Sequence, residues 1–164
     1  MAILPRHFPR VPSVNVSETS ESERFVLSGR KRLGVLLLAL GLLAPLGVAA
    51  MLRPDGRGFG THQQLGLPPC TFRVLFGRRC PSCGMTTSWA YLVRGKLVQA
   101  AAANVGGTLL GVITAVAAIW LLASAVWGRW LGRVPNATLV AWLLAVVAAV
   151  TLVDWVIRLA IGSA

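Results

Sequence analysis

Carboxylate groups are scarce in this 164-residue sequence, which has five Asp and Glu residues against 16 Lys and Arg residues. Asp55 and Asp154 are its only aspartates. The sequence also has no glycine-rich phosphate loop, no Ser-His-Asp set and no paired carboxylates for general acid–base catalysis. These absences argue against hydrolytic enzymes of the usual types.

Charged residues of both signs are few, since only 13% of the residues are charged while 55% are hydrophobic, and the mean hydropathy is +0.70. A soluble globular domain is usually about one quarter charged. The composition therefore indicates an integral membrane protein.

The net charge of +11 raises the question of nucleic-acid binding. The basic residues lie in the N-terminal tail and in loops beside apolar runs, however, and not along one helix face. Arg30, Lys31 and Arg32 directly precede an apolar run, which is the pattern of anchors that contact anionic lipid. We therefore expect the lipid bilayer as a partner, and no nucleic acid.

Three long apolar runs predict transmembrane helices over residues of about 33–52, 106–128 and 138–161, each long enough to cross the hydrocarbon core. The fold class that follows is an all-α integral membrane protein with three spans. Gly107, Gly111 and Ala115 are spaced four apart on the second span. Such a stripe of small residues lets another helix approach closely, from this chain, from a second copy or from another membrane protein.

Outside the spans the sequence predicts two kinds of segment. Residues 1–29 are polar, proline-containing and rich in Ser and Glu, and they predict a disordered tail. Residues 30–164 form a single membrane domain, in which a cysteine-containing loop and a short helix occupy 53–100. That short helix follows the cysteines, and Trp89 and Tyr91 suggest that it lies at the membrane interface.

The distribution of basic residues gives a weak indication of topology. The tail and the loop between spans two and three together hold eight Lys and Arg residues, and the cysteine loop holds seven. The dense cluster at 30–32 favours a cytoplasmic N-terminus, because positive charge is enriched in cytoplasmic segments. The sequence thus predicts a multi-pass protein of the inner cell membrane with the cysteine loop outside.

The motif Cys80-Pro81-Ser82-Cys83 has the spacing of a redox pair. A helix that begins near Thr86 would stabilise a nearby thiolate through its N-terminal dipole. In that interpretation Cys80 attacks, Cys83 resolves and Cys70 acts as a shuttle. The strand pattern that accompanies such motifs in soluble redox proteins is missing, however.

Two other interpretations of the cysteines remain open. Cys70, Cys80 and Cys83 with His62 would make a tetrahedral zinc site, although only one of the two usual Cys-x-x-Cys knuckles is present. Alternatively the cysteines are structural, either in a disulfide between Cys70 and one of the others or as small buried residues. We take a thiol- or zinc-stabilised loop on an accessory or interaction subunit as the leading hypothesis. A membrane thiol-disulfide oxidoreductase is the alternative.

Asp154 and Arg158 lie four residues apart within the third span, so they face the same side of a helix. An ion pair inside a span is costly and suggests a functional site, such as a path for ions or protons. The other interpretation is that Arg158 extends to the headgroups at the end of the span.

The segment from Pro68 to Gly107 resembles the domain-of-unknown-function 2752 family of small bacterial membrane proteins. The signature of that family is a cysteine, a short apolar stretch and a glycine, and then Cys-Pro-x-Cys-Gly-x-Thr. The matching positions are Cys70, Gly77, Cys80, Pro81, Cys83, Gly84, Thr86, Gly95, Ala100 and Asn104.

Two positions depart from the family pattern. Thr87 stands where the family commonly has Arg, and Val105 stands where it has Pro. The resemblance carries no established activity, but it implies that the three cysteines act as a set.

Overall fold

The computed structural model describes residues 26–161 and is built of helices, with no strand in that part of the chain. Three helices are long and apolar enough to span a membrane: α2 (Gly29–Met51), α6 (Val105–Trp127) and α7 (Ala137–Ala160). At 1.5 Å per residue each is about 35 Å long, which exceeds the hydrocarbon core. The predicted all-α class and the three spans are confirmed. Most of the predicted tail, residues 1–25, lies outside the described residues.

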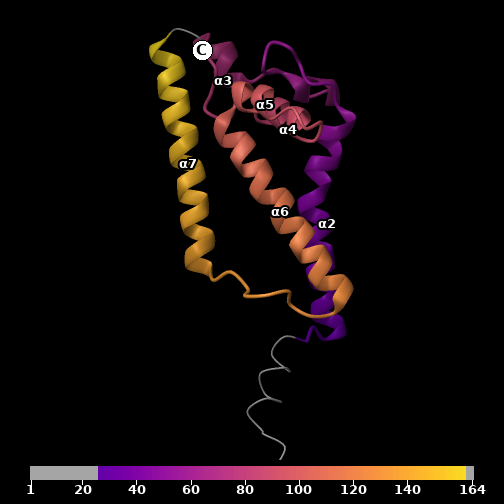
Figure 1. Ribbon diagram of the computed structural model, residues 1–164. Helices are drawn as coiled ribbons and strands as arrows, with labels where there is room; N and C mark the ends of the chain where they lie inside the picture. Colours follow the sequence, from indigo (N-terminus) through magenta and orange to yellow (C-terminus); the bar gives the residue numbers. More distant parts are fainter. Residues whose placement is uncertain (1–25, 162–164) are drawn as a thin grey trace, which may run out of the picture.

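The segment between α2 and α6 forms a small unit at one end of the long helices, which we call the cap (residues 52–104) (Figure 1). It contains the short helices η1 (Thr61–Leu65), α3 (Thr71–Phe76), α4 (Met85–Leu92) and α5 (Leu97–Ala103). The N-terminal end of α2 and the connection from α6 to α7 lie at the opposite end (Figure 1). The cap and the chain entering α2 are therefore at opposite ends of the spans.

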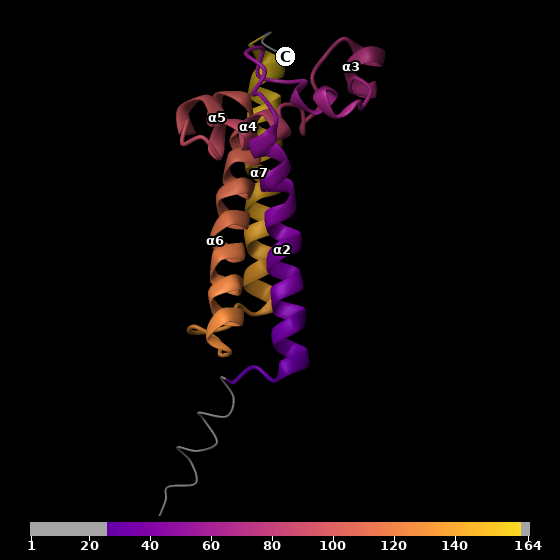
Figure 2. The same ribbon diagram turned by 90° about the vertical axis from the view of Figure 1, so that its right-hand side faces the viewer.

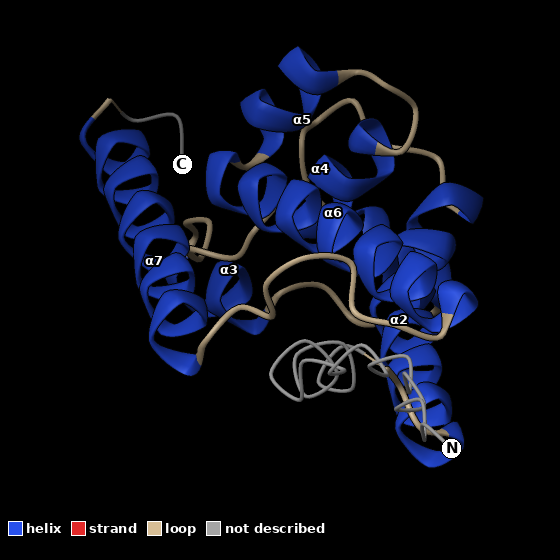
Figure 3. Ribbon diagram, turned by 60° about the horizontal axis from the view of Figure 1, so that its bottom comes forward, coloured by secondary structure: helices blue, strands red, loops and turns tan. Residues whose placement is uncertain are grey.

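Helix α6 lies between α2 and α7 (Figure 3). It packs along α2 through a seam of small and branched side chains that includes Val35, Ala39, Leu121 and Ala125. Small residues in this seam let the two backbones come close, which is how transmembrane helices associate. Helix α7 runs alongside α2 and α6 (Figure 2) and packs on α6. It is mostly exposed, with Val147 buried, so most of its surface suits contact with lipid.

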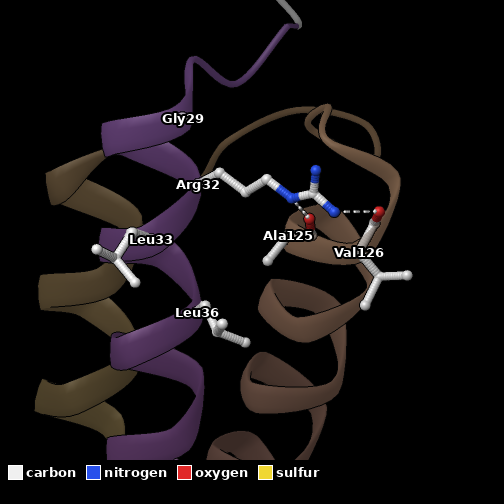
Figure 4. A pocket seen from close by; sticks show the side chains of 6 residues that line it. All are labelled: Gly29, Arg32, Leu33, Leu36, Ala125 and Val126. Carbon is white, nitrogen blue, oxygen red and sulfur yellow. Dashed lines mark hydrogen bonds between the residues drawn. The ribbon is translucent and has the colours of Figure 1, made fainter.

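Two arginines cap the C-terminal ends of this helix pair. Arg32, near the start of α2, donates from Nε to the carbonyl of Ala125 (2.6 Å) and from Nη2 to that of Val126 (3.0 Å), at the end of α6 (Figure 4). Arg94 in the cap donates from Nη2 to the carbonyls of Ala50 (3.0 Å) and Leu52 (2.7 Å), at the end of α2. The last carbonyls of a helix lack intrahelical partners and carry partial negative charge, so a guanidinium there stabilises the helix end.

The small-residue positions on α6 receive a short helix of the same chain. A methyl group added to Gly107 would lie 2.7 Å from Ser88 Oγ, and one added to Gly111 would lie 2.6 Å from Leu92 Cδ2. The indole of Trp89 donates to the Gly107 carbonyl at 2.7 Å. The sequence predicts the close approach of another helix at this stripe, and at Gly107 and Gly111 the short helix α4 occupies the surface. Trp89 is accordingly half-buried against α6.

The Arg94 cap predicts a stability effect. Replacing Arg94 by Met keeps an apolar stem but leaves the terminal carbonyls of α2 without their charged donor. We expect the free energy of unfolding to fall by about 2 kcal/mol. Equilibrium unfolding in detergent, followed by tryptophan fluorescence, measures the change.

Arg53→Met is the matched control, because within the described residues Arg53 makes its hydrogen bonds, both with Gln64, through backbone atoms. Arg53→Met should lower the free energy of unfolding by less than about 0.5 kcal/mol. Equal losses for the two variants would contradict a specific capping role for Arg94.

Candidate functional site

The Cys-Pro-Ser-Cys segment forms a tight turn that leads into α4. The N–H of Cys83 donates to the Cys80 carbonyl at 3.0 Å, and that of Met85 donates to the Ser82 carbonyl at 3.1 Å. Gly84 follows with φ +89°, a left-handed conformation that favours glycine. A Cβ there would lie 2.6 Å from two carbonyl oxygens, those of Gly58 and Ala103. The glycine after the second cysteine is therefore required by both its conformation and its surroundings.

Asn104 joins this turn to the start of α6. Its side-chain Nδ2 donates to the carbonyls of Pro81 (3.0 Å) and Cys83 (3.2 Å), while its Oδ1 accepts from the N–H of Gly107 (2.6 Å). The side chain is buried, and Asn104 is only 2% exposed. Asn104 itself has an extended backbone (φ −165°), and it separates α5 from α6 although the sequence around it is one uninterrupted apolar run. The sequence marked Asn104 as a family position but gave no role for it.

A buried pair of threonines attaches η1 to α4. The hydroxyls of Thr61 and Thr87 lie 2.7 Å apart, and both residues are 0% exposed. This contact brings the neighbouring His62 to the same side of the cap as the cysteines.

One pocket of about 260 Å³ is lined by His62, Cys70, Cys80 and Cys83, with Ser82 and the first turn of α4. The structure thus brings all four residues of the expected thiol and imidazole set to one place. Within it the Sγ atoms of Cys70 and Cys80 are 3.6 Å apart. The sequence motif had favoured Cys80 and Cys83 as the pair.

The geometry of these four residues can be compared with that of a zinc site. In a tetrahedral site with Zn–S bonds of about 2.3 Å, two sulfurs lie about 3.8 Å apart, so the Cys70–Cys80 distance suits one edge of such a site. Among the described residues, however, no three His, Cys, Asp or Glu side chains form a group that could hold a metal ion. His62 and Cys83 line the pocket but do not complete the ligand set.

The electrostatic surroundings of the three thiols differ. The backbone N–H of Arg73 holds the pKa of Cys70 below its ordinary value, chiefly by hydrogen bonding to the thiolate. Burial raises the pKa of Cys80 to about 11 and also raises that of Cys83. Of the three thiols, Cys70 is therefore the one whose surroundings favour the thiolate.

Asp154 and Arg158 lie at the cap end of α7. Arg158 Nε donates to Asp154 Oδ2 at 2.9 Å, and Arg158 Nη1 donates to the Ala103 carbonyl in the cap at 3.2 Å. The neighbouring Trp155 indole donates to the Arg79 carbonyl at 2.7 Å. Arg158 and Trp155 thus connect α7 to the cap, and Asp154 is the ion-pair partner of Arg158.

Residues 70–122 match the family described as Protein of unknown function (DUF2752), which confirms the resemblance inferred from the cysteine motif. The matched segment begins at Cys70 and includes α3, α4, α5 and most of α6. It therefore contains the turn formed by residues 80–84, which we call the thiol turn, together with Asn104 and the glycines that contact α4. No curated protein and no solved structure matches the chain.

The donor role of Asn104 can be tested with a single isosteric change. Asn104→Asp keeps the acceptor for Gly107 but directs a carboxylate at the carbonyls of Pro81 and Cys83. We expect the free energy of unfolding to fall by about 2–4 kcal/mol, since buried acceptors lose their donor. Equilibrium unfolding in detergent measures this change in the free energy of unfolding.

The same substitution at Asn136, the N-cap of α7, is the control. Asn136 only accepts a hydrogen bond, from the Leu139 N–H at 2.8 Å, and an Asp can accept it equally well. Asn136→Asp should change stability by less than about 0.5 kcal/mol. A loss at position 104 no larger than at 136 would contradict the donor role.

The order of thiol pKa values predicts an order of alkylation. A lowered pKa means that the Cys70 thiolate is populated at lower pH, so iodoacetamide should label Cys70 first as pH rises. Cys80 should reach half its maximal rate only near its pKa of about 11. Peptide mass spectrometry after short labelling pulses gives each rate. Labelling of Cys80 ahead of Cys70 near neutral pH would contradict the assignment.

Proposed function

We propose that this integral membrane protein exchanges disulfide bonds with a partner thiol compound or protein through Cys70 and Cys80 in its cap. The observation that supports the proposal most directly is the 3.6 Å separation of the two Sγ atoms beside an accessible pocket. A disulfide requires about 2.05 Å between sulfurs, which small rotations of two side chains can supply from such a starting distance.

The exchange proceeds by two displacements. The Cys70 thiolate attacks one sulfur of a substrate disulfide, a Cys70–substrate disulfide forms, and the other substrate sulfur leaves as a thiolate. Cys80 then loses its proton to solvent and attacks Cys70 Sγ, which releases the second substrate sulfur as a thiolate. The substrate has gained two electrons and the cap holds a Cys70–Cys80 disulfide. A small dithiol or a partner protein dithiol restores the cap by the reverse exchange.

A second candidate is the accessory or interaction subunit with a zinc-stabilised cap. The observation that favours it is the presence of His62 in the same pocket as the three cysteines. In that function Cys70, Cys80, Cys83 and His62 would hold zinc, and the metal would fix the loops of a small cap that has few buried side chains. The missing three-ligand group among the described residues makes it the weaker candidate.

We place the protein in the inner cell membrane with its N-terminus in the cytoplasm. The support is the Arg30–Arg32 cluster at the end of the spans opposite the cap. The cap then faces an oxidising compartment, where disulfides form and persist. A cysteine-reactive reagent that does not cross membranes should label the cap in intact cells.

The full chain, purified in detergent without reductant, distinguishes the two candidates. Oxidised glutathione should produce a Cys70–Cys80 disulfide in wild type and in Cys83→Ser, as seen by peptide mass spectrometry, and no such link in Cys70→Ser. A model disulfide peptide should be reduced by the dithiol form with a rate that falls at least about tenfold in Cys70→Ser. Cys83→Ser is the matched control.

Bound metal is determined by elemental analysis of the same sample. One zinc per chain, with thiols that react only after a chelator is added, would support the second candidate and overturn exchange. An unchanged exchange rate in Cys70→Ser at equal protein level would also overturn it.

A further inference from the structure

Three arginines surround the ring of Phe59 in the cap. The guanidinium carbons of Arg57, Arg73 and Arg79 lie 5.2, 3.9 and 4.4 Å from the ring centroid. Phe59 is 7% exposed, so the ring is a fixed platform. A cation gains energy over an aromatic face, but three cations around one ring also repel one another. This arrangement concentrates positive charge in one part of the cap.

The charge of this arginine cluster (Arg57, Arg73 and Arg79) is only partly compensated. Arg57 forms an ion pair with Asp55, with Nη2 and Oδ2 at 2.7 Å. In residues 26–161 the other ion pair is that of Arg158 with Asp154. Three guanidinium charges against one carboxylate leave two positive charges in the cluster. The three guanidiniums repel one another, and a bound anion would offset this repulsion.

A pocket of about 230 Å³ lies beside Arg57 and Arg79. Its other polar side chains are Tyr91 and Gln99, and the rest of its lining is small: Gly56, Gly58, Ala102 and Ala103. Within the described chain neither the Tyr91 hydroxyl nor the Gln99 amide makes a side-chain hydrogen bond, so both are free to donate into the pocket. Two guanidiniums, a phenol and an amide form a set of donors that matches a small oxyanion.

The geometry around Arg79 holds it in place for such a ligand. Its Nη2 donates to the Arg57 carbonyl at 3.4 Å, and its own carbonyl accepts from the Trp155 indole. Gly58, at φ +79°, lies next to Arg79 Nη1, and any larger residue there would be strained and would narrow the pocket. Arg79 is therefore positioned from its backbone and from its guanidinium before a ligand arrives.

We infer that this pocket binds a phosphate group through Arg57 and Arg79. Planar guanidiniums bind phosphate oxygens with two parallel hydrogen bonds, which lysine cannot do. The cap lies at the end of the spanning helices, where headgroups are found (Figure 1). The phosphate can therefore belong to an anionic phospholipid or to a small soluble compound. The proposal does not depend on the thiol chemistry.

The test uses the full chain purified in a neutral detergent at low ionic strength. Three probes are titrated by calorimetry: inorganic phosphate, short-chain phosphatidylglycerol, and short-chain phosphatidylcholine as the neutral lipid control. We expect saturable binding of inorganic phosphate or of phosphatidylglycerol, and Arg79→Gln should weaken it at least about tenfold. Arg78→Gln is the matched control, because Arg78 is exposed and adjacent in the sequence. It should change affinity less than about twofold.

Each outcome bears on the proposal. Binding of inorganic phosphate points to a soluble ligand, and binding of phosphatidylglycerol alone points to the headgroup. If Arg79→Gln does not fold, Arg57→Gln and Tyr91→Phe take its place, and each should weaken binding. The proposal is overturned if no anionic probe saturates, or if Arg78→Gln weakens binding as much as Arg79→Gln, since that would indicate diffuse surface charge.

Discussion

The buried amide of Asn104 holds the cap on the transmembrane helices. Its two donated hydrogen bonds fix the carbonyls of the thiol turn, and its oxygen caps the first turn of α6. A buried amide with all of its bonds made is rigid, because every alternative position leaves a polar atom unpaired. The positions of Cys80 and Cys83, and the close approach of Gly84 to Ala103, depend on this contact.

The cap has few apolar side chains to bury, and its order comes largely from polar contacts. Thr61 meets Thr87, the Arg94 guanidinium meets the end of α2, and the Trp155 indole meets the Arg79 carbonyl. Each contact connects segments that are distant in the sequence. The thiol pocket and the arginine cluster both belong to the cap, so they share a scaffold while their proposed ligands differ.

The sequence alone predicts the helices but not the contacts between them. Hydropathy predicted the three spans because a bilayer imposes a length and a composition on any helix that crosses it. It could not predict that Gly107 and Gly111 face α4, since a small-residue stripe does not specify its partner. The motif located the cysteines, but the approach of Cys70 to within 3.6 Å of Cys80 depends on the path of the chain through α3. The pKa order depends on burial, which spacing does not encode.

The two capped helix ends have a consequence for acid tolerance. Arg32 and Arg94 bind backbone carbonyls, which do not take up protons in the biological range, and the seam between α2 and α6 is apolar. Asp55 and Asp154 are the only carboxylate side chains in residues 26–161; Asp55 belongs to the cap, and Asp154 pairs with Arg158, which bonds to the cap at Ala103. Protonation of Asp55 would therefore weaken a contact within the cap and leave the helix pair below it unchanged, because the contacts of that pair involve no carboxylate.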